Sequence, residues 1–99
     1  MSSPLFIGVG GHLVAIDPAT GTERWRTKLK AGSFVTILAG EKRVFAGAGG
    51  ELFCVDAASG QILWRNTLRG LGVGVVAFSS SGSELVQQEA AAAAAAAAV

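Results

Sequence analysis

The feature that most constrains this chain is an internal repeat with a period of 39 residues. Eleven positions are identical when residues 5–38 are compared with residues 44–77, and Trp25 falls on Trp64. A period of this length is typical of solenoids and propellers, in which each repeat is one supersecondary unit that packs against its neighbours. The repeat therefore has to be explained before any local motif.

Each copy of the repeat contains four short segments with the composition of β-strands. Gly10 and Gly11 separate the first two segments, and glycine supplies the positive φ angles that a two-residue hairpin turn needs. We expect eight strands, at Leu5–Val9, His12–Ile16, Glu23–Lys28, Phe34–Leu38, Arg43–Gly47, Glu51–Val55, Ile62–Asn66 and Val73–Phe78. No helix is expected inside the repeats, and four antiparallel strands per repeat are the content of one propeller blade.

The segment 15–25 resembles the repeat of the pyrroloquinoline-quinone-type β-propellers, written A-x-D-x-x-T-G-x-x-x-W. The segment 54–64 matches the same pattern, with cysteine in place of alanine and serine in place of threonine. The motif residues are Asp17, Thr20, Gly21 and Trp25 in the first copy, and Asp56, Ser59, Gly60 and Trp64 in the second. The resemblance covers roughly residues 5–78 and implies an all-β propeller fold, but it does not by itself imply the quinone.

The chemistry of the motif residues suits a structural role in the turn. An aspartate at the start of a turn accepts hydrogen bonds from backbone N–H groups of that turn, and a threonine or serine hydroxyl adds a further contact. The glycine takes the left-handed conformation that returns the chain to the next strand. The tryptophan offers a large flat surface for packing against the neighbouring blade. Neither Asp17 nor Asp56 is therefore expected to be catalytic.

The chain divides into three segments by composition. We expect two four-stranded propeller blades over residues 1–78, a linker over residues 79–83 and an alanine-rich helix over residues 84–99. Ser83 suits the N-cap of that helix, and Ala90–Ala98 is an uninterrupted run of the best helix-forming residue. The sequence does not indicate a role for the alanine run.

The order of the strands leaves one strand without a partner at each end of the repeat unit. By the resemblance, the tryptophans lie on the outermost strands, so the first blade lacks its innermost strand and the last strand has no blade. Since an exposed apolar edge strand promotes aggregation, we expect head-to-tail strand exchange between copies. The expected contact residues are Leu5, Phe6 and Ile7 of one copy and Val73, Val75, Val76 and Phe78 of the next.

Two blades do not close a propeller, which typically has about four to eight. The expected partner is therefore the protein itself, in a cyclic homo-oligomer. Proteins of the resembled family usually have eight blades, which favours a tetramer, with a trimer next and a dimer also allowed. A protein or small-molecule ligand of the finished ring is not indicated by the sequence.

Charge and hydropathy exclude several classes of partner and site. The net charge of +1 offers no basic surface for nucleic acid. No apolar run reaches 18 residues, which argues against a membrane span, and no signal-peptide pattern is seen, so cytoplasmic residence is expected. One histidine, His12, and one cysteine, Cys54, do not make a metal site within one chain. The glycine-rich segment 70–74 precedes a strand rather than a helix, so it is not expected to bind phosphate.

Three functions remain open at this point. The first is a non-enzymatic, self-assembling propeller scaffold or binding module, with no catalytic, cofactor-binding or metal-binding residues. The second is a cofactor-binding or ligand-binding protein of the quinone type, with a site at the ring axis. The third is a fragment of a larger propeller. The side chains of Arg24, Arg26, Lys28 and Arg65 lie on outer strands, where charge protects an exposed edge and a ligand role is the less favoured alternative.

Overall fold

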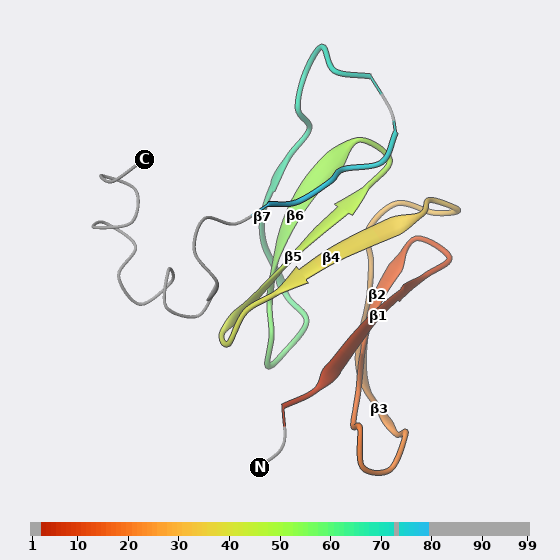
Figure 1. Ribbon diagram of the computed structural model, residues 1–99, viewed down its shortest axis with the longest axis vertical. Helices are drawn as coiled ribbons and strands as arrows, with labels where there is room; N and C mark the ends of the chain where they lie inside the picture. The colour runs from red at the N-terminus through yellow and green to blue at the C-terminus, as the bar shows by residue number, and fades with distance from the viewer. Residues whose placement is uncertain (1–2, 73, 80–99) are drawn as a thin grey trace, which may run out of the picture.

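The computed structural model describes residues 3–72 and 74–79, which form two antiparallel sheets and no helix (Figure 1). The first sheet has the order β1-β2-β3, and the second has the order β4-β5-β6-β7. The strands are β1 (Leu5–Val9), β2 (His12–Ile16), β3 (Glu23–Lys28), β4 (Val35–Ala39), β5 (Arg43–Ala48), β6 (Glu51–Asp56) and β7 (Ile62–Asn66).

The two copies of the repeat fold in the same way. Gly10 and Gly11 join β1 to β2 with φ angles of 59° and 78°, and Gly49 and Gly50 join β5 to β6 with 59° and 79°. Positive φ at both central residues is the requirement of a type I′ hairpin turn. Each sheet also has an irregularity at the equivalent place, between Ala15 and Ile16 in the first and between Cys54 and Val55 in the second.

Seven of the eight expected strands are present, with ends that differ by a single residue. The eighth is not formed: residues 74–79 pair with no strand, and Val73 lies outside the described residues. A strand needs a neighbour to supply its ladder of hydrogen bonds, and the described residues contain no strand beside this segment. The expected linker beyond Ser79 and the expected alanine-rich helix also lie outside the described residues.

One hydrophobic core joins the two sheets. It contains Leu13, Leu29 and Val35 from the first repeat and Val44, Ala46, Ala48, Phe53, Val55 and Ala57 from the second, with Phe6, Trp25, Ile37 and Ile62 packed against it. Successive side chains of a strand point to opposite faces, so each sheet places one face in this core and turns the other away. Figure 1 shows β1 of the first sheet beside β4 of the second.

Residues 74–79 run across the second sheet, as the blue segment in Figure 1 shows. Val76 lies against Gly47 of β5, and Thr36 of β4 donates its hydroxyl to the Val76 carbonyl oxygen at 2.6 Å. In the first repeat, Val35 lies against Gly8 of β1 in the same way. Val76 is therefore the structural equivalent of Val35, and the repeat lengthens by two residues in the loop after β7.

Candidate functional site

The turn after β2 is held together by Asp17. One carboxylate oxygen of Asp17 accepts the backbone N–H of Ala19 at 2.9 Å, and its carbonyl oxygen accepts the N–H of Gly21 at 2.7 Å. The Thr20 hydroxyl donates to the hydroxyl of Thr22 at 2.9 Å. Gly21 has a φ of 78°, in the left-handed region that favours glycine. The motif residues of the first copy therefore form a closed turn.

The turn after β6 repeats this arrangement with Asp56. Its carboxylate accepts both the backbone N–H and the hydroxyl of Ser59, at 2.9 Å and 2.8 Å, and its carbonyl accepts the N–H of Gly60 at 2.8 Å. The hydrogen bond from the Ser59 hydroxyl is the largest cause that holds the pKa of Asp56 below its ordinary value of 3.8, followed by the backbone bond. Both motif aspartates are therefore engaged by their own turns.

The two turns differ in what packs on them. Trp25, on β3, lies on the second turn and donates its indole N–H to the Ala57 carbonyl oxygen at 3.1 Å. A β-carbon added to Gly60 would lie 2.5 Å from the indole ring of Trp25, so only glycine admits this approach. The Thr27 hydroxyl donates to the Gly60 carbonyl oxygen at 2.5 Å. The second turn is thus a seat for the tryptophan of the first repeat.

Trp64 is the second motif tryptophan, and it has no such seat. Its ring packs on Phe45 with centroids 6.2 Å apart, as the ring of Trp25 packs on Phe6 at 5.9 Å. Trp64 is nevertheless 44% exposed, and within residues 3–72 and 74–79 its indole N–H donates no hydrogen bond. Trp64 is therefore held in place by Phe45, but no described segment covers its exposed side.

An ionic cluster ties the first repeat to the second. Glu51, only 8% exposed at the start of β6, accepts from the Lys30 ammonium at 2.5 Å and from the Arg65 guanidinium at 2.9 Å. These hydrogen bonds, that of Lys30 first, hold the pKa of Glu51 below its ordinary value of 4.5. The Arg65 guanidinium also lies 5.1 Å from the centre of the Phe53 ring. Arg65 thus has a structural role, and its counterpart Arg26 pairs with Glu23 at 2.7 Å.

Two sheet faces have no covering sheet, and we name them for the argument that follows. The front face is the side of the first sheet turned away from the core, and it is formed by Leu5, Ile7, Val9, His12, Val14 and Ile16. The back face is the side of the second sheet that is turned away from the core. It is formed by Phe45, Gly47, Leu52, Cys54, Trp64 and Asn66. Residues 74–79 cover part of the back face.

The residues expected to make contact between copies fall in different places. Leu5 and Ile7 lie on the front face, whereas Phe6 points into the molecule against Trp25. Val76 and Phe78 are partly buried, whereas Val75 is 66% exposed. Val73 lies outside the described residues. The sequence did not reveal the role of Glu51, because a lone glutamate on a strand carries no signal of its two cationic partners.

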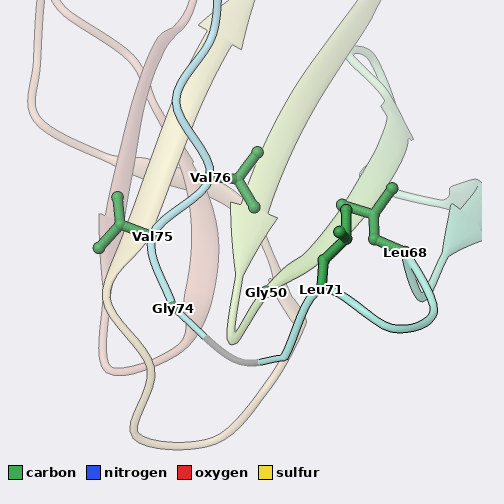
Figure 2. Close-up of a pocket in the computed structure, with 6 residues that line it drawn as sticks. All are labelled: Gly50, Leu68, Leu71, Gly74, Val75 and Val76. Carbon is green, nitrogen blue, oxygen red and sulfur yellow. The ribbon is translucent and has the colours of Figure 1, made fainter.

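A small pocket of about 250 Å³ lies where residues 74–76 pass the hairpin turn of the second sheet (Figure 2). It is lined by Gly50, Leu68, Leu71, Gly74, Val75 and Val76. Every side chain in this lining is apolar, so the pocket has no charged or hydrogen-bonding side chain with which to orient a substrate. The apolar lining suits the packing of hydrophobic side chains.

Two further observations concern the described residues as a whole. They contain no cluster of three or more histidine, cysteine, aspartate or glutamate side chains placed to hold a metal ion. They also contain no helix with the length and hydropathy to cross a membrane.

The comparisons with known proteins place the chain beside a family of repeat proteins. The family model of the outer membrane protein assembly factor BamB, a PQQ-type repeat model, matches residues 9–98. A search of curated proteins finds no match. The family match covers both turns and both motif tryptophans.

Proposed function

This chain belongs to the PQQ-type repeat family of the outer membrane protein assembly factor BamB, and from that premise we propose that it is a non-enzymatic β-propeller module that completes its ring with further copies of itself. The observation that carries this proposal is the front face, where apolar side chains are exposed at positions that the second sheet buries. The motif carboxylates support a structural role, because they are held by turns and not directed into a pocket.

The front face is exposed where its equivalent is covered. Leu5, Ile7 and Val9 are 52%, 38% and 60% exposed, and the residues 39 positions later, Val44, Ala46 and Ala48, are at most 1% exposed. The difference arises because the first sheet packs on this side of the second, while no described segment packs on the front face of the first. Contiguous exposed apolar surface of this kind marks a protein–protein contact.

The side chains of the front face have a combined size similar to that of the equivalent side chains in the core. Ile7 lies directly opposite Val14, and the equivalent pair in the second sheet is Ala46 opposite Phe53. The larger side chain has moved from one strand to the other, so the combined size of each pair is similar. A core tolerates exchanges of this kind when total volume is kept. The front face is therefore suited to the same type of contact that the second sheet makes.

The free edge of β1 supports strand exchange. β1 is an edge strand of a three-stranded sheet, whereas its equivalent β5 lies between β4 and β6. Residues 74–79 lie against the second sheet as β4 lies against the first, with Val76 in the place of Val35. In our proposal, residues 74–79 of one copy add the missing innermost strand to β1 of the next and so form a four-stranded blade.

This exchange is head-to-tail, so each copy uses one surface toward the preceding copy and a different one toward the following copy. Such contacts close a ring when the rotation between copies fits. With two blades per copy, and about four to eight blades in a propeller, we propose a cyclic tetramer, with a trimer as the next choice.

The test is sedimentation of the unmodified protein beside two matched variants. Ile7→Glu places a charge on the front face and is expected to return the protein to its 10.0 kDa monomer, because burial of an unpaired carboxylate costs several kcal/mol. Leu63→Arg is the control, since Leu63 is also exposed, at 45%, and its counterpart 39 positions earlier, Arg24, is already an arginine. Assembly that survives Ile7→Glu contradicts the proposal, as does removal of residues 73–78 without change in mass.

A further inference from the structure

Glu51 shows which charges meet where the two repeats of one chain touch. It is 8% exposed, and it accepts from the Lys30 ammonium at 2.5 Å and from the Arg65 guanidinium at 2.9 Å. Lys30 comes from the loop that follows the first repeat, whereas Glu51 and Arg65 belong to the second. One carboxylate therefore serves two cations at this place, and cations brought together there without it would repel each other.

The first sheet lacks this carboxylate at the equivalent position. His12 stands where the second repeat has Glu51. Lys28 lies directly opposite His12 on β3, where the second repeat has the uncharged Thr67. Side chains opposite each other on neighbouring strands have β-carbons about 5 Å apart. Lys28 and His12 are therefore neighbours, and in the described part of the chain the Lys28 ammonium has no carboxylate within ion-pair distance.

The other groups around His12 do not supply the missing negative charge. The carboxylate of β3, that of Glu23, is engaged by the Arg26 guanidinium through hydrogen bonds of 2.7 Å and 2.8 Å. β1, on the other side of β2, has no charged residue. The Nδ1–H of His12 donates to the Gly10 carbonyl oxygen at 3.0 Å, because a carbonyl oxygen only accepts. This bond orients the ring and leaves Nε2 for a further partner.

The preceding copy would bring a further cation to this place. Arg69 stands three residues after Asn66, as Lys30 stands three residues after Thr27. In the proposed assembly, Arg69 would therefore come toward the first sheet of the next copy as Lys30 comes toward Glu51 within one chain. Arg69 is exposed, and among residues 3–72 and 74–79 it has no ion-pair partner. The contact would thus add an arginine to a lysine and a histidine.

We propose that the contact between copies binds a small oxyanion, such as inorganic phosphate or sulfate, in the place that the Glu51 carboxylate takes within the chain. Lys28 and His12 of one copy hold the anion from one side, and Arg69 of the preceding copy holds it from the other. This inference rests on the proposed function, because the site is complete only when two copies meet.

The three side chains have the chemistry that an oxyanion requires. A guanidinium and an ammonium donate charge-assisted hydrogen bonds to phosphate and sulfate oxygens. The Nε2 of His12 donates when the ring carries its second proton, and a nearby anion favours that protonated form. The anion also separates positive charges that would otherwise oppose the approach of Arg69 to Lys28.

The first test compares assembly in sodium sulfate with assembly in sodium chloride at equal ionic strength, because salt itself screens charges. We expect about 10 mM sulfate to lower the concentration of half-assembly by about tenfold. His12→Glu supplies the carboxylate within the chain, so this variant is expected to assemble in chloride and to lose the response. Since sulfate also strengthens apolar burial in general, the response that remains in His12→Glu measures that general effect.

Two matched variants separate the site from net charge. Lys28→Gln and Lys42→Gln each remove one positive charge from an exposed residue. Lys42 lies between β4 and β5 of the second sheet, whereas Lys28 lies on β3 of the first. We expect Lys28→Gln to lose most of the response to sulfate and Lys42→Gln to keep it.

The part played by His12 is tested by pH. A histidine changes its charge between about pH 5 and pH 8, whereas sulfate keeps both of its charges in this range. The response to sulfate is therefore expected to be larger at about pH 6 than at about pH 8. In His12→Gln the response is expected to be equal at the two pH values, and a response that still depends on pH in that variant excludes His12 as a ligand.

The outcomes separate the anion site from the proposed function. Equilibrium dialysis with radioactive sulfate is expected to find one anion for each contact of the assembled protein. Assembly without bound sulfate, or with no greater response to sulfate than that of His12→Glu, overturns the site and leaves self-assembly standing. A protein that stays at 10.0 kDa in both salts at every concentration overturns the proposed function, and the site with it.

Discussion

Val35 lies directly against Gly8, so that a β-carbon on Gly8 would be 2.6 Å from the Val35 Cβ and 3.2 Å from its carbonyl oxygen. The first strand of the second sheet approaches the first sheet at this point, and the approach requires a residue without a side chain. We expect Gly8→Ala to lower the free energy of unfolding by about 1–3 kcal/mol, as overpacking of a core does. Urea denaturation measures this loss, and an unchanged midpoint would show that the two sheets do not pack as described.

Gly47→Ala is the companion to that variant. A β-carbon on Gly47 would meet the side chains of Val76 and Thr36 instead of another sheet of the same chain. We expect a smaller loss of stability than for Gly8→Ala, because residues 74–79 belong to no sheet, whereas Val35 is fixed in β4. Assembly is expected to weaken, since in our proposal those residues add a strand to the next copy. Equal destabilisation by both variants would contradict this distinction.

The two tryptophans are expected to respond differently to replacement by phenylalanine. Trp25→Phe removes the donor to the Ala57 carbonyl, and Ala57 is only 8% exposed, so a loss of about 1–3 kcal/mol is expected from an unsatisfied buried acceptor. Trp64→Phe removes no hydrogen bond within the described residues and is expected to leave the stability of dilute monomer within about 0.5 kcal/mol. Thermal unfolding at low concentration compares the two, and a larger loss for Trp64→Phe would be evidence against the asymmetry.

The ionic cluster of Glu51 predicts a dependence of stability on pH. The pKa of Glu51 is lowered in the folded protein, chiefly by the hydrogen bond from Lys30 and then by that from Arg65. A lowered folded pKa means that the stabilisation is complete above the ordinary value of 4.5 and is lost as the pH falls below it. When the urea midpoint is measured from pH 7 downward, it is expected to decrease as the pH falls below that value.

Glu51→Gln isolates the contribution of that carboxylate. The variant has no charge to lose, so its midpoint is expected to be lower than that of the unmodified protein at pH 7 and to change less on acidification. The decrease that remains is assigned to Asp56 and Glu23, whose pKa values are also lowered, by Ser59 and by Arg26 respectively. If the urea midpoint of Glu51→Gln depends on pH as strongly as that of the unmodified protein, the acid dependence arises from Asp56 and Glu23 and not from Glu51.

His12 is the position at which the proposed contact between copies would differ from the contact between the two repeats of one chain. It stands where the second repeat has Glu51, and the residues that correspond to Lys30 and Arg65 are Arg69 and Arg26. In the proposed head-to-tail assembly, Arg69 of one copy would come toward His12 of the next, without a carboxylate between them. We expect His12→Glu to supply that carboxylate and to lower the concentration of half-assembly by several-fold, as a partly buried ion pair does. His12→Gln is the uncharged control, and an equal effect of both variants would exclude an ionic cause.

The strands could be predicted from the sequence because each repeat contains local signals for turns and strands. Paired glycines at the hairpin turns and alternating side chains on Glu23–Lys28 act within a few residues of each other, and seven strands follow from them. The comparison of the two copies also identified Trp25 and Trp64 as equivalent positions.

The prediction of the last strand was wrong, because a strand needs a neighbouring strand and the described residues place none beside this segment. Residues 74–79 have the composition of a strand but pair with no strand. The sequence comparison also held the period at 39, whereas the equivalence of Val35 and Val76 requires two more residues in the loop after β7. Glycines at 70, 72 and 74 hide this change, since the loop has no side-chain pattern that would fix the alignment.

The contact between Trp25 and the turn after β6 could be predicted in part from the sequence. The resemblance placed the tryptophans against neighbouring blades, but only the structure shows that Gly60 is covered while Gly21 is open. Phe6 illustrates the opposite case, because it belongs to an expected contact strand and yet points inward to Trp25. The face on which a residue lies depends on register, and a slip of one residue moves every side chain to the opposite face.

The mass of the unmodified protein in solution, measured by light scattering over a range of concentrations, tests the central claim most directly. The account predicts a defined multiple of the 10.0 kDa chain, with four copies favoured and three next. A folded protein that remains a monomer at every concentration would contradict it.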